Sequence, residues 1–162
     1  MNGEAVQTRP AGANMGAAIV DPAKQSVLLA ALYIAQEQQG YLTKEAIERV
    51  AKRLGLRPGD VYSTASFYTL FRTAPVGRYV IQVCDGLSCY LCDGAGRIAG
   101  YVGKKLNLGP GETSADGRFT LEMVQCLASC GTAPAMRVND QLYENLTPAA
   151  IDAILERLMG EV

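Results

Sequence analysis

The chain has 162 residues, of which 49% are hydrophobic and 19% are charged, and its formal net charge is -1. This composition indicates a globular protein, and a domain of this length buries roughly 68–70% of its unfolded surface, so a core can form without disulfides. The lack of a basic surplus argues against a nucleic-acid partner. All apolar runs are far shorter than the ~20 residues of a spanning helix, which argues against direct insertion into a membrane.

Residues 1–21 are rich in Ala, Gly and polar side chains, and they lack the basic start and long apolar stretch of a secretory signal. We expect them to form a flexible arm that a partner could order. Without export, the cysteines of the chain would lie in a reducing compartment, where disulfides are rare. We therefore expect the cysteines to serve metal binding or redox chemistry.

Residues 22–75 carry apolar side chains at helical spacing and predict an N-terminal helical bundle. Asp21-Pro22 is a typical helix start, and Gly40 would end that first helix. Thr43 can cap a second helix that Gly55 ends. A third apolar segment carries four aromatic side chains, which we expect to be core, with a docking surface as the alternative. These four are Tyr62, Phe67, Tyr68 and Phe71.

The pattern changes after the turn-like segment 74–77, and residues 76–162 predict a second domain. Its predicted elements are a strand over 78–83, a helix over 90–106, a loop over 107–117, a strand over 119–125, a hairpin of 135–139 and 141–145, and a helix from Thr147. The order β-α-β-β-α indicates a compact layered fold. The chain as a whole is therefore predicted to be α/β, with a helical bundle before the α/β domain.

Four of the five cysteines form two close pairs. Cys84 and Cys89 are spaced C-x4-C, and Cys126 and Cys130 are spaced C-x3-C. Each pair follows a predicted strand, whose end fixes the first sulfur while a short loop brings back the second. Four thiolates without any histidine can hold an iron–sulfur cluster or a structural zinc ion. Zinc is the weaker alternative, because zinc pairs are usually spaced C-x2-C.

The two loops are also short enough to aim several backbone N–H groups at the sulfurs, which would stabilise a negatively charged cluster. We expect Gly86, in the first loop, and Gly131, after the second, to permit a close approach of the backbone. Pro134 would stiffen the exit of the second loop.

The fifth cysteine, Cys92, has no partner in a site of two pairs, and we expect it to be a buried apolar filler. An alternative is a thioredoxin-type dithiol of Cys89 and Cys92, which are spaced C-x-x-C. That hypothesis leaves Cys126 and Cys130 without a role. Without histidine no Ser/His/Asp set can form, and the scattered carboxylates show no acid–base pairing, so no catalytic side chains are expected.

Several spaced motifs resemble a known family. The runs VCDGLSC and GETSADGRFTLEMVQCLASCGTAPAMRVND resemble the thioredoxin-like [2Fe-2S] ferredoxin family. Upstream, QGYLTKEAIERVAKRLGL, VYSTASFYTLF and PVGRYVIQVC resemble one branch of it, the 24 kDa (E) subunits of NADH-quinone oxidoreductase, or respiratory complex I. The resemblance covers about residues 22–160.

The resemblance implies a thioredoxin-like fold for residues 76–162, a helical domain over 22–75, and a [2Fe-2S] cluster. Its ligands would be Cys84, Cys89, Cys126 and Cys130. Two departures from the family pattern stand out. Ala128 occupies the position at which the family usually has glycine, in C-L-G-x-C, and Cys92 is not a family ligand position, so its role stays open.

The resemblance further implies an electron-transfer subunit of an oxidoreductase and not a free-standing enzyme. FMN and NAD would bind to a larger partner chain, whose flavin exchanges electrons with the cluster during NADH oxidation. The small diaphorase subunit of an NAD-linked hydrogenase or formate dehydrogenase is the alternative, and a zinc-stabilised interaction module or a dithiol oxidoreductase is less favoured. The expected location is cytoplasmic, at the inner face of the cell membrane through the complex.

Overall fold

The computed structural model describes residue 24 and residues 26–92 and 94–160, so the predicted arm over 1–21 and the Asp21-Pro22 helix start lie outside the described residues. The chain divides into two compact units between Thr73 and Ala74. No helix of the described part combines the length and the apolar character needed to cross a bilayer.

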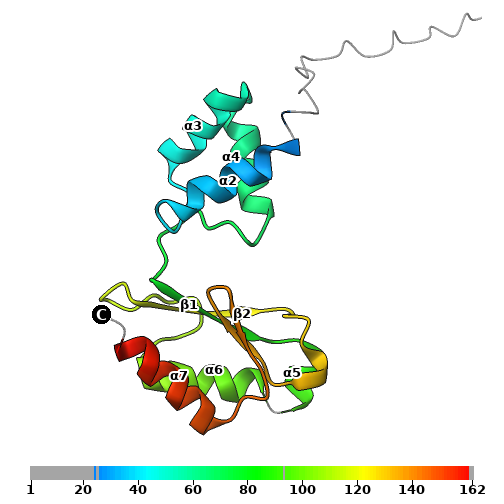
Figure 1. Ribbon diagram of the computed structural model, residues 1–162, viewed down its shortest axis with the longest axis vertical. Helices are drawn as coiled ribbons and strands as arrows, with labels where there is room; N and C mark the ends of the chain where they lie inside the picture. The colour runs from blue at the N-terminus through cyan, green and yellow to red at the C-terminus, as the bar shows by residue number, and fades with distance from the viewer. Residues whose placement is uncertain (1–23, 25, 93, 161–162) are drawn as a thin grey trace, which may run out of the picture. The chain divides into compact units, whose positions relative to one another are not determined.

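The described helices of the first unit are α2 (Leu28–Glu37), α3 (Lys44–Leu54) and α4 (Pro58–Phe67) (Figure 1). Thr43 caps α3 as predicted, because its side-chain oxygen accepts a hydrogen bond from the N–H of Ala46 at 3.1 Å. Gly55 ends α3 in the left-handed conformation, with φ of 65°, which a residue without Cβ adopts readily. Pro58 begins α4, where its missing N–H leaves no hydrogen bond unmade.

Side chains from these helices and their connecting loops form one hydrophobic cluster. Its buried members are Leu28, Leu32, Leu42, Ile47, Ala51, Val61, Ala65 and Phe71. The buried amide of Gln36 adds a polar tie beside this cluster: its nitrogen donates to the carbonyl of Leu70 at 2.9 Å, and its oxygen accepts from the N–H of Arg72 at 2.7 Å. Gln36 thereby fixes the segment after α4 to α2.

The prediction that the aromatic side chains near α4 are core was right for Phe71 and wrong for the other three. The three are Tyr62 (53% exposed), Phe67 (77%) and Tyr68 (37%). The small residues Val61 and Ala65 make the contact between α4 and the core, so the larger rings are not needed there. Phe67 and Tyr68 instead pack edge to face outside the core, with ring centroids 5.1 Å apart.

The second unit is a four-stranded sheet with helices. Its strands are β1 (Tyr79–Cys84), β2 (Phe119–Val124), β3 (Met136–Val138) and β4 (Gln141–Tyr143). Its helices are α5 (Leu87–Leu91), α6 (Ala95–Leu106), the short 3-10 helix η1 (Cys130–Thr132) and α7 (Pro148–Gly160). The strand order is β2-β1-β3-β4, in which β1 and β2 are parallel and the other neighbours antiparallel. The predicted α/β class, both long strands, the hairpin and the last helix are confirmed.

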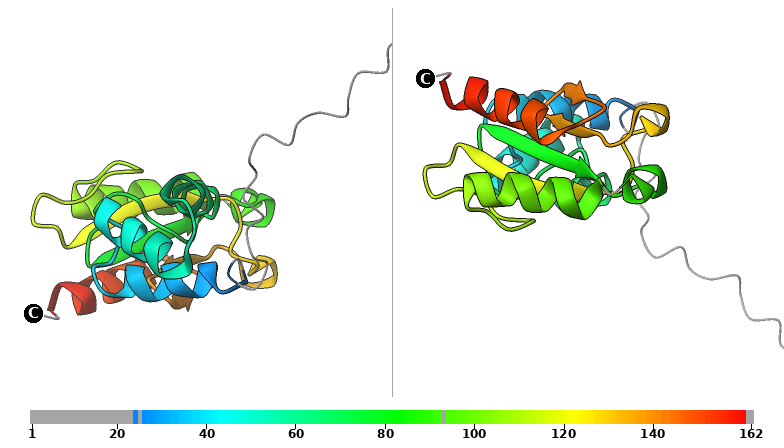
Figure 2. Two further views of the ribbon diagram at one scale, coloured as in Figure 1. Left: turned by 90° about the horizontal axis from the view of Figure 1, so that it is seen from above. Right: turned by 90° about the horizontal axis from the view of Figure 1, so that it is seen from below.

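The helix predicted over 90–106 is divided in two. The short helix α5 ends at Leu91, and α6 begins at Ala95 (Figure 2). Gly94, just before α6, lies close to other atoms: a Cβ there would lie 2.5 Å from Cβ of Pro134 and 2.7 Å from the carbonyl oxygen of Cys89. The break separates α5, which carries Cys89, from α6, which packs on the sheet.

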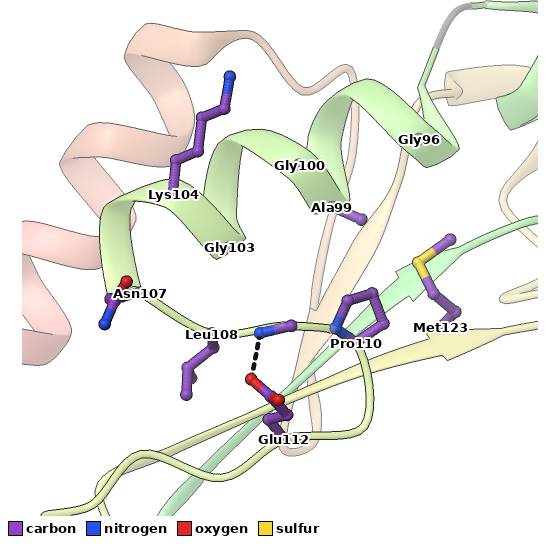
Figure 3. Close-up of a pocket in the computed structure, with 11 residues that line it drawn as sticks. Gly96, Ala99, Gly100, Gly103, Lys104, Asn107, Leu108, Pro110, Glu112 and Met123 are labelled. Carbon is purple, nitrogen blue, oxygen red and sulfur yellow. Dashed lines mark hydrogen bonds between the residues drawn. The ribbon is translucent and has the colours of Figure 1, made fainter.

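The end of α6 makes a close contact with the loop that follows it (Figure 3). A Cβ on Gly103 would lie 2.5 Å from the carbonyl oxygen of Leu108, so this approach requires glycine. The carboxylate of Glu112 accepts a hydrogen bond from the N–H of Gly109 at 2.6 Å and holds the loop closed. Together with Met123, these residues line a cavity of about 580 Å³, and no cysteine lines it.

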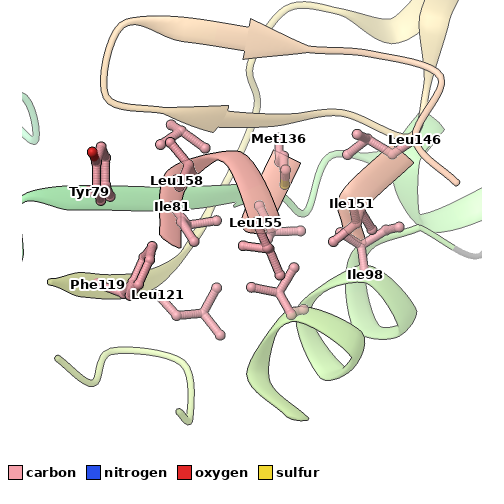
Figure 4. Packing of buried hydrophobic residues seen from close by; sticks show 14 residues of the cluster. Tyr79, Ile81, Ile98, Phe119, Leu121, Met136, Leu146, Ile151, Leu155 and Leu158 are labelled. Carbon is pink, nitrogen blue, oxygen red and sulfur yellow. The ribbon is translucent and has the colours of Figure 1, made fainter. Parts of the chain in front are cut away.

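The main core of the second unit lies between the sheet and the helices α6 and α7, which cover the same face of the sheet (Figures 1 and 4). Because side chains alternate along a strand, Tyr79, Ile81 and Val83 of β1 point into this core. Its other buried members are Ile98, Ala99, Val102, Phe119, Leu121, Met136, Val138, Leu146, Ile151, Leu155 and Leu158. The same alternation leaves Cys84 outside this core, in a separate buried cluster with Cys89 and Ala135.

Candidate metal centre

The parallel pairing of β1 and β2 brings the two cysteine pairs to one end of the sheet. Cys84 is the last residue of β1 and lies beside Val124, the last residue of β2. The N–H of Asp85 donates to the carbonyl of Val124 at 2.7 Å, so the two chains stay together beyond the strands. Cys126 follows two residues after Val124 and therefore starts its loop next to the loop of Cys84.

The first cysteine loop, residues 84–89, buries both of its sulfurs: Cys84 and Cys89 are each 3% exposed. Gly86 permits the close approach that the sequence predicts, because a Cβ there would lie 3.1 Å from the carbonyl oxygen of Gln125 and 3.4 Å from Sγ of Cys84. The same Cβ would lie 3.7 Å from Sγ of Cys126. Gly86 thus marks the place where the two loops meet.

The second cysteine loop, residues 126–130, leaves Cys126 and Cys130 exposed. Ala128 adopts the left-handed conformation, with φ of 58°, and its N–H donates a hydrogen bond to Sγ of Cys126 at 3.3 Å. Alanine in this conformation is disfavoured by its Cβ, which explains why glycine is usual at this position in the family that the sequence resembles. At Gly131, by contrast, a Cβ would meet no described atom within 4 Å, so its predicted role in a close approach to a cluster stays a prediction.

A polar group that the sequence analysis did not identify involves residues on either side of Cys130 in the chain. The hydroxyls of Ser129 and Thr132 both donate to the carboxylate of Glu144, and the two hydroxyl oxygens lie 2.8 Å apart. These hydrogen bonds lower the pKa of Glu144 below its ordinary value. Glu144 follows β4, so no sequence motif connects it to the cysteines.

The electrostatics of the site differ between the two buried thiols. Burial alone raises the pKa of Cys84, but hydrogen bonds from the backbone of Gly86 and Leu127, and from the thiols of Cys89 and Cys126, outweigh it and leave the pKa below the ordinary value. Burial and the neighbouring Cys84 raise the pKa of Cys89, against a hydrogen bond from the backbone of Ala135. Of these two buried thiols, Cys84 therefore loses its proton more readily than Cys89.

These interactions link ligands of the two predicted pairs. The thiol of Cys84 interacts with both Cys89 and Cys126, and Cys130 acts electrostatically on Cys89. In the described part of the chain, no group of three or more His, Cys, Asp or Glu side chains is arranged to hold a metal ion. A [2Fe-2S] cluster does not need three protein ligands around one metal ion, because each of its two irons binds only two of the four thiolates. Buried sulfurs flanked by backbone N–H donors fit such a cluster.

Cys92 does not join this group. The prediction that it is a buried filler was wrong, because Cys92 is exposed at the end of α5. The physical reason is its place at the C-terminal cap of α5, after the last helical residue Leu91 and before α6 begins at Ala95, and not within a helix that packs on the core. Cys89, its possible dithiol partner, is buried and interacts with Cys84.

Comparison with known proteins shows which family this chain belongs to. The model of the thioredoxin-like [2Fe-2S] ferredoxin family matches residues 17–159. The E 2 subunit of the NADH-quinone oxidoreductase of Rhizobium meliloti is 44% identical over 135 residues, which are 83% of this chain and 80% of the relative. The corresponding (E) subunit of Escherichia coli is 41% identical over 137 residues (85% and 81%), and subunit 2 of the Thermus thermophilus enzyme is 39% identical over 136 residues (83% and 75%).

Among solved structures, the air-oxidized NAD+-reducing [NiFe]-hydrogenase contains a chain that superimposes with a TM-score of 0.72 at 26% identity. The match covers 82% of this chain and 23% of the hydrogenase chain. The resemblance noted in the sequence is thus confirmed over most of the length. This chain belongs to the thioredoxin-like [2Fe-2S] ferredoxin family.

Proposed function

We propose that this chain is an electron-transfer subunit of an NADH-quinone oxidoreductase, and that Cys84, Cys89, Cys126 and Cys130 hold its single [2Fe-2S] cluster. When bound, such a cluster accepts and releases one electron at a time. FMN and NAD would bind to a larger partner chain of the same complex. The observation that carries the proposal is the meeting of both cysteine loops at Gly86, where sulfurs from each loop lie against one backbone segment.

The residues around the sulfurs support this role. The first loop keeps Cys84 and Cys89 away from water, which limits side reactions at the irons. Backbone N–H groups from both loops donate to sulfur and stabilise the negative charge of the site. Cys126 and Cys130 are exposed, so this side of the site would be the one open to a redox partner.

The alternative with a specific observation in its favour is the small diaphorase subunit of an NAD-linked hydrogenase, because an NAD+-reducing hydrogenase shares the fold. The quinone oxidoreductase is favoured over it for two reasons. Its subunits are 39–44% identical to this chain, against 26% for the hydrogenase. This chain also spans 75–81% of those subunits but 23% of the hydrogenase chain.

We further propose that residues 22–75 form a helical domain that binds the partner chain, while residues 76–162 carry the cluster. Supporting this division, the exposed rings of Tyr62, Phe67 and Tyr68 provide an apolar surface that the core of the first unit does not use. Leu29 of α2 and Tyr68 line a common cavity of about 460 Å³, which extends this surface. Attachment to such a complex would place the chain in the cytoplasm, peripheral to the membrane.

Metal analysis of the anaerobically purified chain tests the proposal. Iron and acid-labile sulfide in equal amounts, together with the electron paramagnetic resonance signal of a reduced [2Fe-2S] cluster, are expected. A colourless protein that contains zinc would contradict the cluster, whereas redox activity that survives removal of iron would support a dithiol enzyme. Co-purification with a flavin-containing chain tests the assembly separately.

A further inference from the structure

The carboxylate of Glu144 connects two residues that lie on either side of Cys130 in the chain, Ser129 and Thr132. Glu144 lies 15 residues after Ser129 and 12 residues after Thr132, and it accepts hydrogen bonds from both hydroxyls through the same oxygen, Oε1. Ser129 is 9% exposed, so its hydroxyl has little access to water and depends on a protein acceptor. Glu144 itself is exposed, which means that it can be replaced without disturbing the hydrophobic core.

Backbone hydrogen bonds extend this contact. The N–H of Asn145 donates to the carbonyl of Thr132 at 2.8 Å, and the N–H of Leu146 donates to the carbonyl of Pro134 at 3.0 Å. Residues 144–146 therefore run along residues 132–134 and are fixed to them. The carboxylate of Glu144 is held in place on this segment, so it provides a firm anchor for Ser129.

Ser129 is in turn the neighbour of Ala128, whose left-handed backbone, with φ of 58°, is unfavourable for alanine. A disfavoured backbone conformation persists only where the surrounding structure fixes it. The conformation has a use here, because the backbone N–H groups of Leu127 and Ala128 donate to the sulfurs of Cys84 and Cys126. Whatever fixes Ser129 also fixes these two donors.

We propose that Glu144 is a positioning residue for the metal centre, which acts through Ser129 and Thr132 to hold the second cysteine loop with its N–H groups directed at the sulfurs. The inference rests on the proposed function, namely that the four cysteines bind a [2Fe-2S] cluster. Glu144 touches none of the four cysteines by hydrogen bond, so its effect passes through the loop conformation.

Two substitutions of Glu144 distinguish an effect of its hydrogen bonds on the loop conformation from an effect of its negative charge on the cluster. Glu144→Gln and Glu144→Ala remove the same negative charge, but glutamine keeps an oxygen that can accept from both hydroxyls. Loss of N–H···S hydrogen bonds lowers the reduction potential of a cluster, because these bonds stabilise the more negative, reduced state. Positioning therefore predicts a more negative potential in Glu144→Ala than in Glu144→Gln, whereas a pure charge effect predicts equal potentials.

The test uses the full-length chain with its cluster, in the wild type and in both Glu144 variants. The midpoint potential is measured by redox titration followed by electron paramagnetic resonance, and the rate of bleaching is measured with an iron chelator. We expect Glu144→Ala to bleach several-fold faster than wild type, with Glu144→Gln in between, and to have the more negative potential of the two variants. Glu112→Ala is the matched control, since Glu112 also holds a loop but accepts from Gly109, and it should bleach as wild type does.

A further substitution, Ala128→Gly, provides an independent check of the inference. Glycine adopts the left-handed conformation without help, so Ala128→Gly combined with Glu144→Ala should recover most of the wild-type bleaching rate. Equal potentials and rates in Glu144→Ala and Glu144→Gln would overturn the inference, as would an unchanged acceleration in the Ala128→Gly background. A wild-type protein without iron and sulfide would instead contradict the proposed function, so the two failures are distinguishable.

Discussion

The N–H of Ala128 donates a hydrogen bond to Sγ of Cys126 across 3.3 Å, and it does so from a backbone with φ of 58°. For an L-residue with a Cβ, this conformation costs about 1–2 kcal/mol. The second cysteine loop thus gains an N–H donor for sulfur at the expense of local backbone strain. The strain follows from alanine, and not from the loop, because glycine would make the same turn without it.

We therefore predict that Ala128→Gly stabilises the folded protein by up to about 1 kcal/mol, after allowing for the greater freedom of glycine in the unfolded chain. The expected result is a higher midpoint of thermal unfolding and slower thermal bleaching of the cluster. Ala153→Gly is the control: Ala153 is an exposed residue of α7, where glycine should destabilise by about 1 kcal/mol. A lower midpoint in both variants would contradict the strain at Ala128.

The ligand set is tested by serine substitutions, one cysteine at a time. Replacing any of Cys84, Cys89, Cys126 or Cys130 should remove most of the visible absorption and most of the bound iron, because a hydroxyl is a poor substitute for a thiolate on iron. Cys92→Ser is the control and should keep the spectrum, since Cys92 is exposed at the end of α5. Bleaching of the Cys92 variant would show that the ligand set is wrong.

Much of the fold could be predicted because its signals are local. The cap at Thr43, the left-handed Gly55, and the strands that end at Cys84 and Val124 are each encoded within a few neighbouring residues. For the cysteines, the register of β1 and β2 places Cys84 beside Val124, two residues before Cys126, so the ends of both predicted strands meet as the sequence suggests.

The remaining features depend on contacts between distant residues. The close approach at Gly94 involves Pro134, 40 positions later, and no local pattern predicts it or the exposure of Cys92. The hydrogen bonds of Glu144 to Ser129 and Thr132 join segments on either side of a hairpin and leave no pattern in the sequence. Phe67 was misplaced for a different reason: periodicity counts apolar side chains, but it cannot tell that Val61 and Ala65 already complete the contact with the core.

The exposed aromatic surface on the first unit predicts a binding contribution from Phe67, the most exposed of its rings at 77%. Burying a phenylalanine against a partner stabilises a complex by about 2 kcal/mol, so Phe67→Ser should weaken binding to the flavin-containing chain by more than about tenfold. Its iron content should stay unchanged. Met159→Ser, a 45% exposed residue of α7, is the control for a general loss of surface hydrophobicity. Wild-type affinity in Phe67→Ser would show that this surface serves another purpose.

The polar contact between α6 and α7 predicts how stability depends on pH. Asp152 accepts a hydrogen bond from the hydroxyl of Tyr101, at 2.9 Å to Oδ2, and pairs with Lys105 over 3.0 Å. The hydrogen bond from Lys105, and then that from Tyr101, lower the pKa of Asp152, while the same pair raises the pKa of Lys105. Removing the pair by Asp152→Asn should lower the free energy of unfolding only slightly, because both partners are partly exposed to water.

The direction of each pKa shift determines the pH range over which the Asp152–Lys105 pair stabilises the folded protein. A carboxylate whose pKa is lowered by folding stabilises the protein above its unfolded value, about 3.9, and loses this contribution as the pH falls through the folded pKa. A lysine whose pKa is raised stabilises below about 10.4 and loses its contribution as the pH rises through the folded pKa. Urea unfolding of wild type, Asp152→Asn, Lys105→Gln and the double variant should therefore give a constant coupling between about pH 5 and pH 9, which disappears in acid. A coupling that grew toward low pH would contradict the lowered pKa of Asp152, because a protonated carboxyl can no longer attract Lys105.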